Sequence, residues 1–420
     1  MFTTLSLEDS TNLEKISTQT TNPLLICNFC DKELNFRGYL VIDSTIRGKC
    51  CGGIRLSTDV SLYETTSLAH NMTLKYGFIG FPLGGAKAGI RIKGELTKTK
   101  RKQVFTKVGE MLSPFLTNGS YIPGPDMGTS YEDIDWLLNA AVSNKDYRDH
   151  ANTSLYTSWT MMSSAIEALT RLNLKLKGTE IAIEGFGNIG VSVAKIFSEK
   201  GAKVVAISTF KGAIFNKKGL DVTRLFELKG KCGDDIVNNY SDAEKIAKDQ
   251  LLCLPVDILL PCAGPWTINS KNAHDIKARI VCPGANIPIT SEAENILFNR
   301  EIISLPDFVT NCGGVLGSFM GSMVSEQTKK EIILNYFGKR VSRVLQISQE
   351  QGIPPILVAN KIALERFHKI KNSYEKTNLK NQLRNQIKTT IPKVYKRIFT
   401  KPRAKKIFAQ MLLSNESTLE

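Results

Sequence analysis

The stretch TEIAIEGFGNIGVSVAKIFSEKGAKVVAI, residues 179–207, decides the fold. Short runs of apolar and β-branched residues stand at both ends, and between them apolar residues recur with a helical period. These patterns predict a strand at 179–184, a helix at 188–200 and a second strand at 204–207. A strand, a turn, a helix and a following strand form a βαβ unit, which predicts a parallel sheet.

Three glycines occupy the turn between the first strand and the helix of this unit. Gly185 permits a tight turn, Gly187 lets the backbone approach a pyrophosphate, and Gly190 lets the helix pack closely on the strand. The start of the helix then offers free N–H groups and a partial positive charge to phosphates. A purely structural glycine turn is the alternative. The candidate dinucleotide site is therefore Gly185, Phe186, Gly187, Asn188, Ile189 and Gly190.

The end of the second strand indicates which dinucleotide binds. Sites for NAD usually place an acid there to hold the ribose 2′-hydroxyl, but this chain reads Ser208-Thr209-Phe210-Lys211. No carboxylate stands at this point to repel a 2′-phosphate, and Lys211 would attract one. We therefore expect Thr209 and Lys211 to contact NAD or NADP, with a mild preference for NADP.

The rest of the chain separates into two blocks of different pattern. From residue 160 short β-branched runs alternate with helices, which is typical of a parallel sheet covered on both faces. Before about residue 155 the pattern is mixed, with two strands near the start and three helices. The elements expected in this earlier block are strands 24–29 and 38–42 and helices 58–76, 98–117 and 131–143.

A lysine in the earlier block has the surroundings of a catalytic base. Lys87 stands in Gly84-Gly85-Ala86-Lys87-Ala88-Gly89, which reads as a loop with room for a ligand. Lys75 precedes it at the end of an apolar helix, and Asp126 follows in a proline-rich loop. A buried lysine beside a cation loses its proton more readily, and a neighbouring carboxylate can shuttle protons.

Seven motifs in order resemble the glutamate/leucine/phenylalanine/valine dehydrogenase family over most of residues 24–330. The motifs are the Lys87 loop, the Asp126 loop, the Gly185–Gly190 turn, Gly52-Gly53-Ile54-Arg55, Leu260-Pro261-Cys262-Ala263, Gly284-Ala285-Asn286, and Pro306-Asp307 to Asn311-Cys312-Gly313-Gly314.

The resemblance implies a role for each matching residue. Lys75 would bind the substrate α-carboxylate, Lys87 would activate the water that attacks the imine, and Asp126 would move protons to and from the amino nitrogen. Asn286 and Asn311 would lie beside the nicotinamide and its ribose, next to Cys262 and Ala263. The implied reaction is NAD(P)-dependent oxidative deamination of an L-amino acid to a 2-oxo acid and ammonium, or its reverse.

The resemblance also implies the architecture. We expect an α/β protein with a substrate and oligomerisation domain built on a mixed sheet, a Rossmann-like doubly wound domain, and a cleft between them. The expected boundaries are 1–157 for the first domain and 158–330 for the second, with helices of 331–420 returning to the first. A homo-oligomer acting on small molecules follows from the same likeness.

Four positions bear on the substrate. Members that use glutamate place a lysine directly before the Gly-Gly that here includes Gly53, where it neutralises the side-chain carboxylate, but this chain has Cys51. Gly124 leaves extra room beside Asp126. These features favour an apolar or aromatic amino acid, since a buried carboxylate without a partner is costly. Ser318 favours the alternative, glutamate, and so does Lys49, which lies two residues before Cys51.

Two departures from the family concern activity. The usual Ala-Thr-Gly-x-Gly stretch reads Ser158-Trp159-Thr160-Met161-Met162 here, and Pro283 replaces an acid before Gly284. Either change would alter the hinge or the cofactor pocket. The alternative of another class is therefore a catalytically weakened relative that regulates or binds polyanions through a basic tail.

The net charge of +15 is concentrated at the C-terminus. Residues 361–420 contain 15 Lys and Arg but only 4 Asp and Glu. Such a segment binds polyanions weakly, or is simply a solvated tail. Its aromatic residues are too sparse for a base-stacking surface, so we do not expect nucleic acid to be a partner.

The remaining composition indicates a reducing compartment. Nine cysteines in 420 residues form no disulfide pattern, and the first twenty residues lack a signal peptide's basic start and apolar centre. No apolar run is long enough to span a membrane. We therefore expect a cytoplasmic protein without a metal; zinc at Cys27, Cys30, Cys50 and Cys51 is the alternative.

Overall fold

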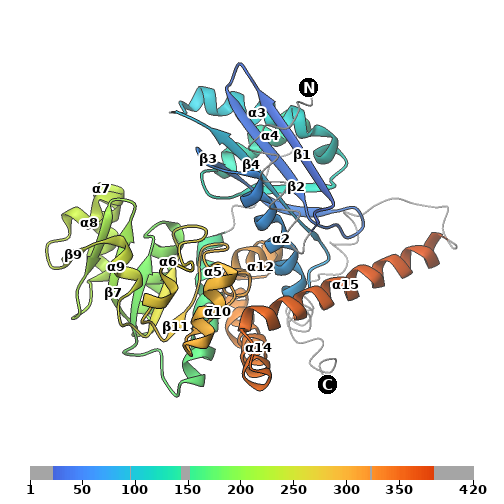
Figure 1. Cartoon of the computed structure of the whole chain (residues 1–420). Helices are drawn as coiled ribbons and strands as arrows, with labels where there is room; N and C mark the ends of the chain where they lie inside the picture. Colours follow the sequence, from blue (N-terminus) through green and yellow to red (C-terminus); the bar gives the residue numbers. More distant parts are fainter. Residues whose placement is uncertain (1–21, 95, 143–151, 322–323, 383–420) are drawn as a thin grey trace. The chain divides into compact units, whose positions relative to one another are not determined.

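The computed structural model describes residues 22–94, 96–142, 152–321 and 324–382 (Figure 1). Its contacts divide these residues into two compact units. The first unit comprises the described residues before His150 together with those from Ile362 onward. The second unit comprises the described residues from Ala151 to Lys361. Each unit has its own sheet and its own helices.

The first unit is built on a five-stranded mixed sheet in the order β1-β2-β4-β3-β5. The pairs β1–β2 and β2–β4 are antiparallel, whereas β4–β3 and β3–β5 are parallel. This mixture agrees with the expected fold. The strands are β1 (Leu25–Asp31), β2 (Phe36–Ile42), β3 (Cys50–Ser57), β4 (Gly84–Ile92) and β5 (Tyr121–Pro125).

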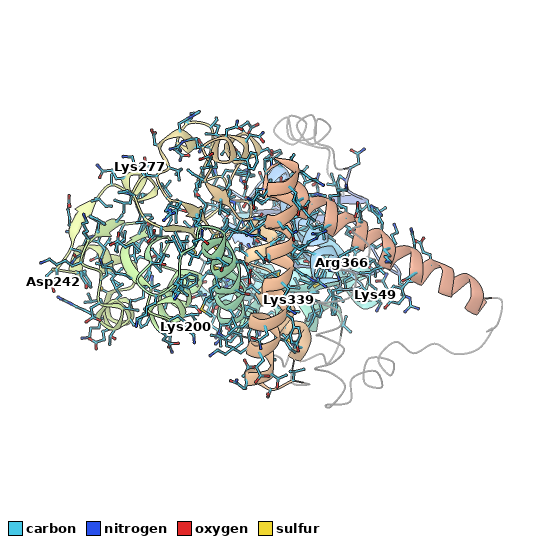
Figure 2. All side chains as sticks on the ribbon, turned by 90° about the horizontal axis from the view of Figure 1, so that it is seen from below. Lys49, Lys200, Asp242, Lys277, Lys339 and Arg366 are labelled. Atoms are coloured by element: carbon cyan, nitrogen blue, oxygen red, sulfur yellow. The ribbon has the colours of Figure 1, made fainter. Side chains whose placement is uncertain are left out.

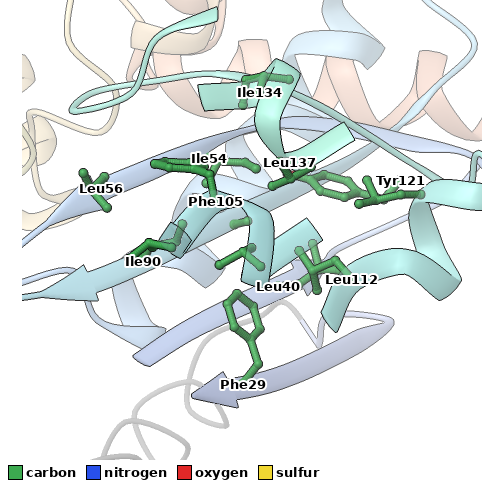
Figure 3. Close-up of a cluster of buried hydrophobic side chains, with 14 of the residues drawn as sticks. Phe29, Leu40, Ile54, Leu56, Ile90, Phe105, Leu112, Tyr121, Ile134 and Leu137 are labelled. Carbon is green, nitrogen blue, oxygen red and sulfur yellow. The ribbon is translucent and has the colours of Figure 1, made fainter. Parts of the chain in front are cut away.

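The two faces of this sheet carry different side chains. Apolar residues of one face, among them Leu40, Ile54 and Ile90, pack against α3 (Lys98–Thr117) and α4 (Tyr131–Ala141) in a buried core (Figure 3). Helix α2 (Leu62–Ile79) covers the other face. Because side chains alternate along a strand, that second face carries the residues between the core positions: Tyr39 and Val41, which pack against α2, and polar and glycine residues of β3 and β4.

The expected glycine-rich loop around Lys87 is wrong, because these residues form β4. β4 pairs with β2 on one side and β3 on the other, so its backbone groups are satisfied within the sheet. Gly85 and Gly89 allow close packing against α2, and Gly84 allows close packing against the backbone of Ser44. A Cβ on Gly85 would lie 2.2 Å from the backbone nitrogen of Thr73 in α2, so only glycine allows this approach.

The second unit contains a seven-stranded sheet in the order β12-β11-β10-β6-β7-β8-β9. The five strands from β12 to β7 are parallel, and β8 and β9 extend the sheet in antiparallel fashion. From β6 the chain proceeds first to β7 on one side and later to β10 on the other. This is the doubly wound arrangement that the sequence predicts. The strands are β6 (Glu180–Glu184), β7 (Lys203–Thr209), β8 (Gly212–Phe215), β9 (Glu244–Ile246), β10 (Ile258–Pro261), β11 (Ile280–Val281) and β12 (Ile303–Ser304).

Helices accompany the strands and continue beyond them. Helix α5 packs against α6, α12 and α14, so the segment after residue 330 stays with the second unit until Lys361, later than expected. The helices are α5 (Thr153–Arg171), α6 (Asn188–Ser198), α7 (Val222–Cys232), α8 (Ile236–Asn239), α9 (Lys248–Leu252), α10 (Ser291–Asn299), α11 (Asp307–Thr310), α12 (Gly313–Met320), α13 (Glu326–Ile332), the π-helical η4 (Ile333–Phe337), α14 (Gly338–Gln351) and α15 (Pro355–Gln382), with short 3₁₀ turns η1 (Gly233–Asp235) and η2 (Ala273–Asp275).

Charged side chains of the second unit, such as Lys200, Asp242 and Lys277, are exposed to solvent (Figure 2). The basic segment after residue 382 and the first twenty residues lie outside the described part of the chain. No helix among the described residues is both long and apolar enough to cross a bilayer.

The cysteines are separated by the fold. Cys27 and Cys30 lie on β1, and Cys50 and Cys51 lie on β3, with β2 and β4 between them. Neighbouring strands are about 4.8 Å apart, so these two pairs cannot share one zinc ion. All nine cysteines are free thiols.

Candidate active site

The register of three parallel strands brings the candidate catalytic residues onto one face of the first sheet. Arg55 of β3 is opposite Gly89 of β4, and Gly53 of β3 is opposite Gly124 of β5. Paired residues of parallel strands point to the same side, as do residues two apart. Lys87 and Asp126 therefore belong to the same face, which we call the site face and which α2 covers in part.

Lys87 and Asp126 meet on the site face. Lys87 Nζ lies 3.0 Å from Asp126 Oδ2, and the lysine side chain is only 4% exposed. Burial disfavours the ammonium ion and lowers the pKa of Lys87, which outweighs the opposing attraction of Asp126. A lysine with a lowered pKa in contact with a carboxylate has the properties of a general base that can hand on its proton.

Arg55 is a member of this cluster that the sequence reasoning did not single out. Its Nε donates to Asp126 Oδ2 at 2.9 Å, and its Nη1 donates to the carboxylate of Glu64 on α2. Burial raises the pKa of Asp126, but the charges of Lys87 and Arg55 outweigh this effect and hold it well below its usual range. Asp126 is therefore ionised at neutral pH.

The remaining substrate candidates of the first unit lie around this pair. Burial raises the pKa of the Cys51 thiol to about 11, although a hydrogen bond with Tyr76 and the charge of Lys87 oppose this rise, so the thiol is neutral. A Cβ on Gly53 would lie 2.9 Å from Cβ of Asp126, whereas one on Gly124 would meet nothing within 4 Å. Lys75, one residue before Tyr76 on α2, is buried.

The glycine turn of the second unit lies at the carboxyl end of β6, where the strand order switches direction. Ligands of doubly wound sheets bind at this point. Gly185 has φ of +88°, and a Cβ there would lie 2.7 Å from the backbone of Ala263 after β10. The Cys262 amide donates to the Glu184 carbonyl at 2.7 Å, and the Phe186 amide donates to the Ser208 carbonyl at 2.7 Å. The turn is thus held between β10 and β7.

This turn fits a dinucleotide. A Cβ on Gly187 would meet nothing within 4 Å, so the space in front of the backbone is open, and no side chain caps the start of α6. Asn311 Nδ2 donates to Asn286 Oδ1 at 3.0 Å and to the Ala285 carbonyl at 2.9 Å. The Asn311 Oδ1 atom is buried and has no hydrogen-bond partner among the described residues. It is suited to accept a hydrogen bond from a carboxamide.

The two departures from the family pattern are accommodated around Asn311. The hydroxyls of Thr157 and Thr160 on α5 accept hydrogen bonds from the Gly314 and Gly313 amides at the start of α12, both at 3.2 Å. The Thr310 hydroxyl donates to the Pro283 carbonyl at 2.5 Å, which holds the loop that lacks the usual acid. Ser318, on α12, donates its hydroxyl to the Gly314 carbonyl at 2.7 Å.

The end of β7 carries no carboxylate of its own, and it contacts the backbone of a turn that contains Asp234. The Thr209 hydroxyl donates to the Asp234 carbonyl at 2.8 Å, and the carboxylate of Asp234 pairs with Lys229. The Lys211 ammonium lies 5.0 Å from the ring centre of Phe210, which is 68% exposed. A turn 25 residues later therefore brings the backbone of Asp234 against this strand end, while the Asp234 carboxylate is engaged by Lys229.

A second residue beyond the sequence reasoning is Glu184, directly before Gly185. Burial raises its pKa to about 7, although a hydrogen bond from the Thr267 hydroxyl opposes the rise. At neutral pH this carboxyl is therefore partly protonated. Glu184 would therefore repel a pyrophosphate bound at the turn less than a fully ionised carboxylate would.

We expect replacement of Gly190 with valine to weaken dinucleotide binding. A Cβ at this position would lie 2.1 Å from the Gly185 carbonyl oxygen, so α6 must move away from the turn. Overpacking of this kind costs about 1–3 kcal/mol, and if the displaced turn loses this much binding energy, the dinucleotide binds about 5- to 150-fold more weakly. Titration of NADH or NADPH fluorescence measures the effect. Gly230→Val is the control, because a Cβ on Gly230 meets nothing within 4 Å; equal affinities for both variants would contradict the proposed role of Gly190.

Both units match models of a known family. Residues 26–142 match the Glu/Leu/Phe/Val dehydrogenase dimerisation domain, and residues 150–374 match Glutamate/Leucine/Phenylalanine/Valine dehydrogenase. The chain belongs to this family. The resemblance seen in the sequence is thus confirmed, and this dehydrogenase acts on the CH–NH₂ group of amino acids with NAD or NADP.

Individual relatives agree with this assignment. The dehydrogenase is 30% identical over 321 residues to the NADP-specific glutamate dehydrogenase of Saccharolobus shibatae, covering 71% of this chain and 75% of the relative. It shares the fold of the hetero-hexameric glutamate dehydrogenase of Thermus thermophilus, with a TM-score of 0.69, 22% identity and coverage of 86% and 94%. It also shares the fold of the L-tryptophan dehydrogenase of Nostoc punctiforme, with a TM-score of 0.59, 21% identity and coverage of 86% and 99%.

Proposed function

We propose that this dehydrogenase oxidatively deaminates an apolar or aromatic L-amino acid, with Lys87 and Asp126 as its catalytic residues. The observation that carries the proposal is the buried contact of 3.0 Å between these two groups on the site face. The neutral thiol of Cys51 on the same face supports the choice of substrate. The reverse reaction, reductive amination of a 2-oxo acid, uses the same residues.

In this proposal the side chains of the site face bind substrate and move protons. Lys75 binds the α-carboxylate, and Asp126 accepts a proton from the amino nitrogen. A bound nicotinamide supplies the acceptor for the hydride that leaves the α-carbon. Lys87 in its neutral form removes a proton from the water that attacks the imine carbon. Asp126 then returns a proton to the nitrogen, the carbon–nitrogen bond breaks as the new hydroxyl loses its proton, and the released ammonia takes up that proton to become ammonium.

The overall change balances. One amino acid, one water and one oxidised coenzyme give one 2-oxo acid, one ammonium ion, one reduced coenzyme and one proton. The α-carbon is oxidised by two electrons, and the oxygen of the new carbonyl comes from water. The protein contributes positioning and electrostatics. The lowered pKa values of Lys87 and Asp126 set the protonation states of the two groups.

The substrate preference rests on the charge available to a substrate side chain. Cys51 and Tyr76 are joined by a hydrogen bond and are uncharged. A Cβ on Gly119 would lie 3.7 Å from Lys49 Nζ. Gly119 precedes β5 whereas Asp126 follows it, so the Lys49 ammonium is directed to the opposite end of this strand. We infer that it does not replace the missing lysine at position 51.

Glutamate is the second candidate substrate, favoured by the names of the relatives. The first relatives in sequence are glutamate dehydrogenases, and Ser318 occupies the position of a serine found in glutamate-using members. The absorbance at 340 nm after mixing the protein with a panel of amino acids and NAD⁺ or NADP⁺ decides between the two. A kcat/KM for glutamate above that for every apolar amino acid would overturn the proposed preference.

We expect Cys51→Lys to shift the preference toward glutamate. The new ammonium would neutralise the substrate's side-chain carboxylate, and a charged hydrogen bond contributes about 1.5–3 kcal/mol, or about 10- to 100-fold in the ratio of kcat/KM values. Cys51→Ser is the matched control, since serine is small and neutral. If both variants keep the same ratio of glutamate to apolar activity, residue 51 does not contact the substrate side chain.

Three further points belong to the proposal. NADP remains mildly preferred because Lys211 offers a cation beside the end of β7, although Asp234 is close by. A homo-oligomer is proposed because the first unit matches a dimerisation domain and the Thermus relative is a hetero-hexamer. The nine free cysteines support a reducing compartment, the cytoplasm.

A further inference from the structure

Behind Lys87 and Asp126 the first unit buries a second pair of opposite charges. Arg55 is 4% exposed and Glu64 is 7% exposed. Buried charges are expensive unless they are paired, so a second buried ion pair adjoining the first calls for an explanation. The proposed reaction assigns no role to either residue.

The four groups form a continuous row of alternating charge. Lys87 and Arg55 both contact the same oxygen of Asp126, Oδ2, at 3.0 and 2.9 Å. Arg55 extends its other arm to Glu64, which lies in the first turn of α2. No hydrogen bond to Asp126 Oδ1 is present among the described residues. The carboxylate is thus held by one oxygen and has the other available.

We propose that Arg55 is a positioning residue that orients Asp126 so that Oδ1 exchanges the proton with the substrate nitrogen, and that Glu64 holds Arg55 in place. This inference rests on the proposed roles of Lys87 and Asp126. Arg55 also places a permanent cation beside Lys87. From the sequence alone, Lys75 was the only cation expected near Lys87. The Arg55 charge contributes to the lowered pKa of Lys87 after the larger effect of burial, whereas Glu64 acts in the opposite direction.

The helix α2 connects this row to the substrate region. Glu64 and Lys75 are eleven residues apart, close to three helical turns, and therefore lie on the same side of α2. One helix thus supports both the residue that holds Arg55 and the proposed ligand of the α-carboxylate. The titratable and charged groups on the elements around the pair are Cys50, Cys51 and Arg55 of β3, Lys87 and Arg91 of β4, Tyr121 of β5 and Asp126 after it, and Tyr63, Glu64, His70, Lys75 and Tyr76 of α2.

Opposite pH shifts in two variants test the inference. In Arg55→Met the loss of a cation raises the pKa values of Lys87 and Asp126, so the pH profile of kcat/KM moves to more alkaline pH by about 1 unit. In Glu64→Gln the loss of an anion lowers the pKa of Lys87, so the profile moves to more acid pH. Shifts in the same direction, or no shift in either variant, would overturn the role of Arg55 and Glu64.

A double variant that removes both charges separates positioning from folding. The double variant Arg55→Met/Glu64→Gln removes both buried charges and avoids the unpaired carboxylate that destabilises the single Arg55 variant. Its profile should lie between those of the single variants. The kcat of the Arg55 variants should fall about 10- to 100-fold with KM nearly unchanged, since a misplaced proton-transfer group affects the chemical step.

A second measurement of the Lys87 pKa does not require turnover. Brief acetylation with acetic anhydride across a range of pH modifies neutral amines, and peptide mass spectrometry then gives the apparent pKa of Lys87 itself. We expect the Lys87 pKa measured in this way to rise in Arg55→Met and to fall in Glu64→Gln. If the wild-type protein oxidises glutamate but no apolar or aromatic amino acid while the shifts appear, the proposed function fails and the Arg55 inference stands. If turnover occurs but the labelling profiles coincide, the inference fails alone.

The matched control is Arg101→Met. Arg101 contacts the fully buried Asp133 through Nε at 2.6 Å, in an ion pair that includes neither Lys87 nor Asp126. Loss of Arg101 should lower the thermal stability much as loss of Arg55 does, because both leave a buried carboxylate unpaired. The Arg101 variant should keep the wild-type pH profile. If the pH profile of Arg101→Met shifted as much as that of Arg55→Met, general destabilisation would explain both shifts.

Discussion

Lys87→Ala is expected to reduce kcat for amino-acid oxidation by about 10³-fold. The variant removes the only group proposed to deprotonate the attacking water, and the cavity that remains lies beside a carboxylate that is ionised but far less basic than an amine. Because the glycine turn belongs to the other unit, the affinity for NADH or NADPH should stay at the wild-type value. Steady-state absorbance at 340 nm and fluorescence titration measure the two quantities separately.

The control for this variant is Lys93→Ala. Lys93 is exposed just beyond the end of β4, and its loss should leave kcat unchanged. Near-normal kcat in Lys87→Ala would overturn the proposed role of Lys87. A large loss of coenzyme affinity in the same variant would indicate that the substitution disturbs more than the site face.

Asp126→Asn is expected to have an effect of similar size, about 10³-fold on kcat. The amide keeps the shape of the carboxylate but cannot exchange the proton, and it leaves both Lys87 and Arg55 without their shared anion. With that anion lost, the pKa of Lys87 falls further, so the small remaining activity should persist to lower pH than in the wild-type enzyme. The pH dependence of kcat/KM measures this shift.

Asp59→Asn serves as the control for Asp126→Asn. Asp59 is exposed in the turn between β3 and α2, where it accepts a hydrogen bond from Ser57. Its replacement should change neither kcat nor the pH profile. If Asp126→Asn retains more than about a tenth of the wild-type kcat, proton transfer by this residue is not a major part of catalysis.

The second unit was the more predictable of the two. The expected strands at 179–184 and 204–207 correspond to β6 and β7, and the glycine turn lies between β6 and α6. Parallel strands of such a sheet are buried on both faces, so they appear as plain apolar runs. The short antiparallel strands β8 and β9 were missed, because β9 is a polar three-residue strand at the sheet edge.

The first unit shows where local patterns fail. Glycine is unfavourable in strands, so Gly84 to Gly89 reads as a loop, yet these residues form the centre of the sheet. The long-range contact with α2 decides this, since only glycine fits under the helix backbone. Arg55 was present in a quoted motif, and its spacing of two and four residues from Gly53 and Cys51 was the available signal that all three share a face.

By itself the sequence determined the dinucleotide turn, the doubly wound sheet and the family, because these depend on residues close together in the chain. Tertiary structure alone decided which charges meet. Arg55 and Asp126 are 71 residues apart and become neighbours only because β3 pairs with β5 in one particular register. The pKa values of Lys87 and Asp126 follow from that register and from burial, which no local pattern of residues specifies.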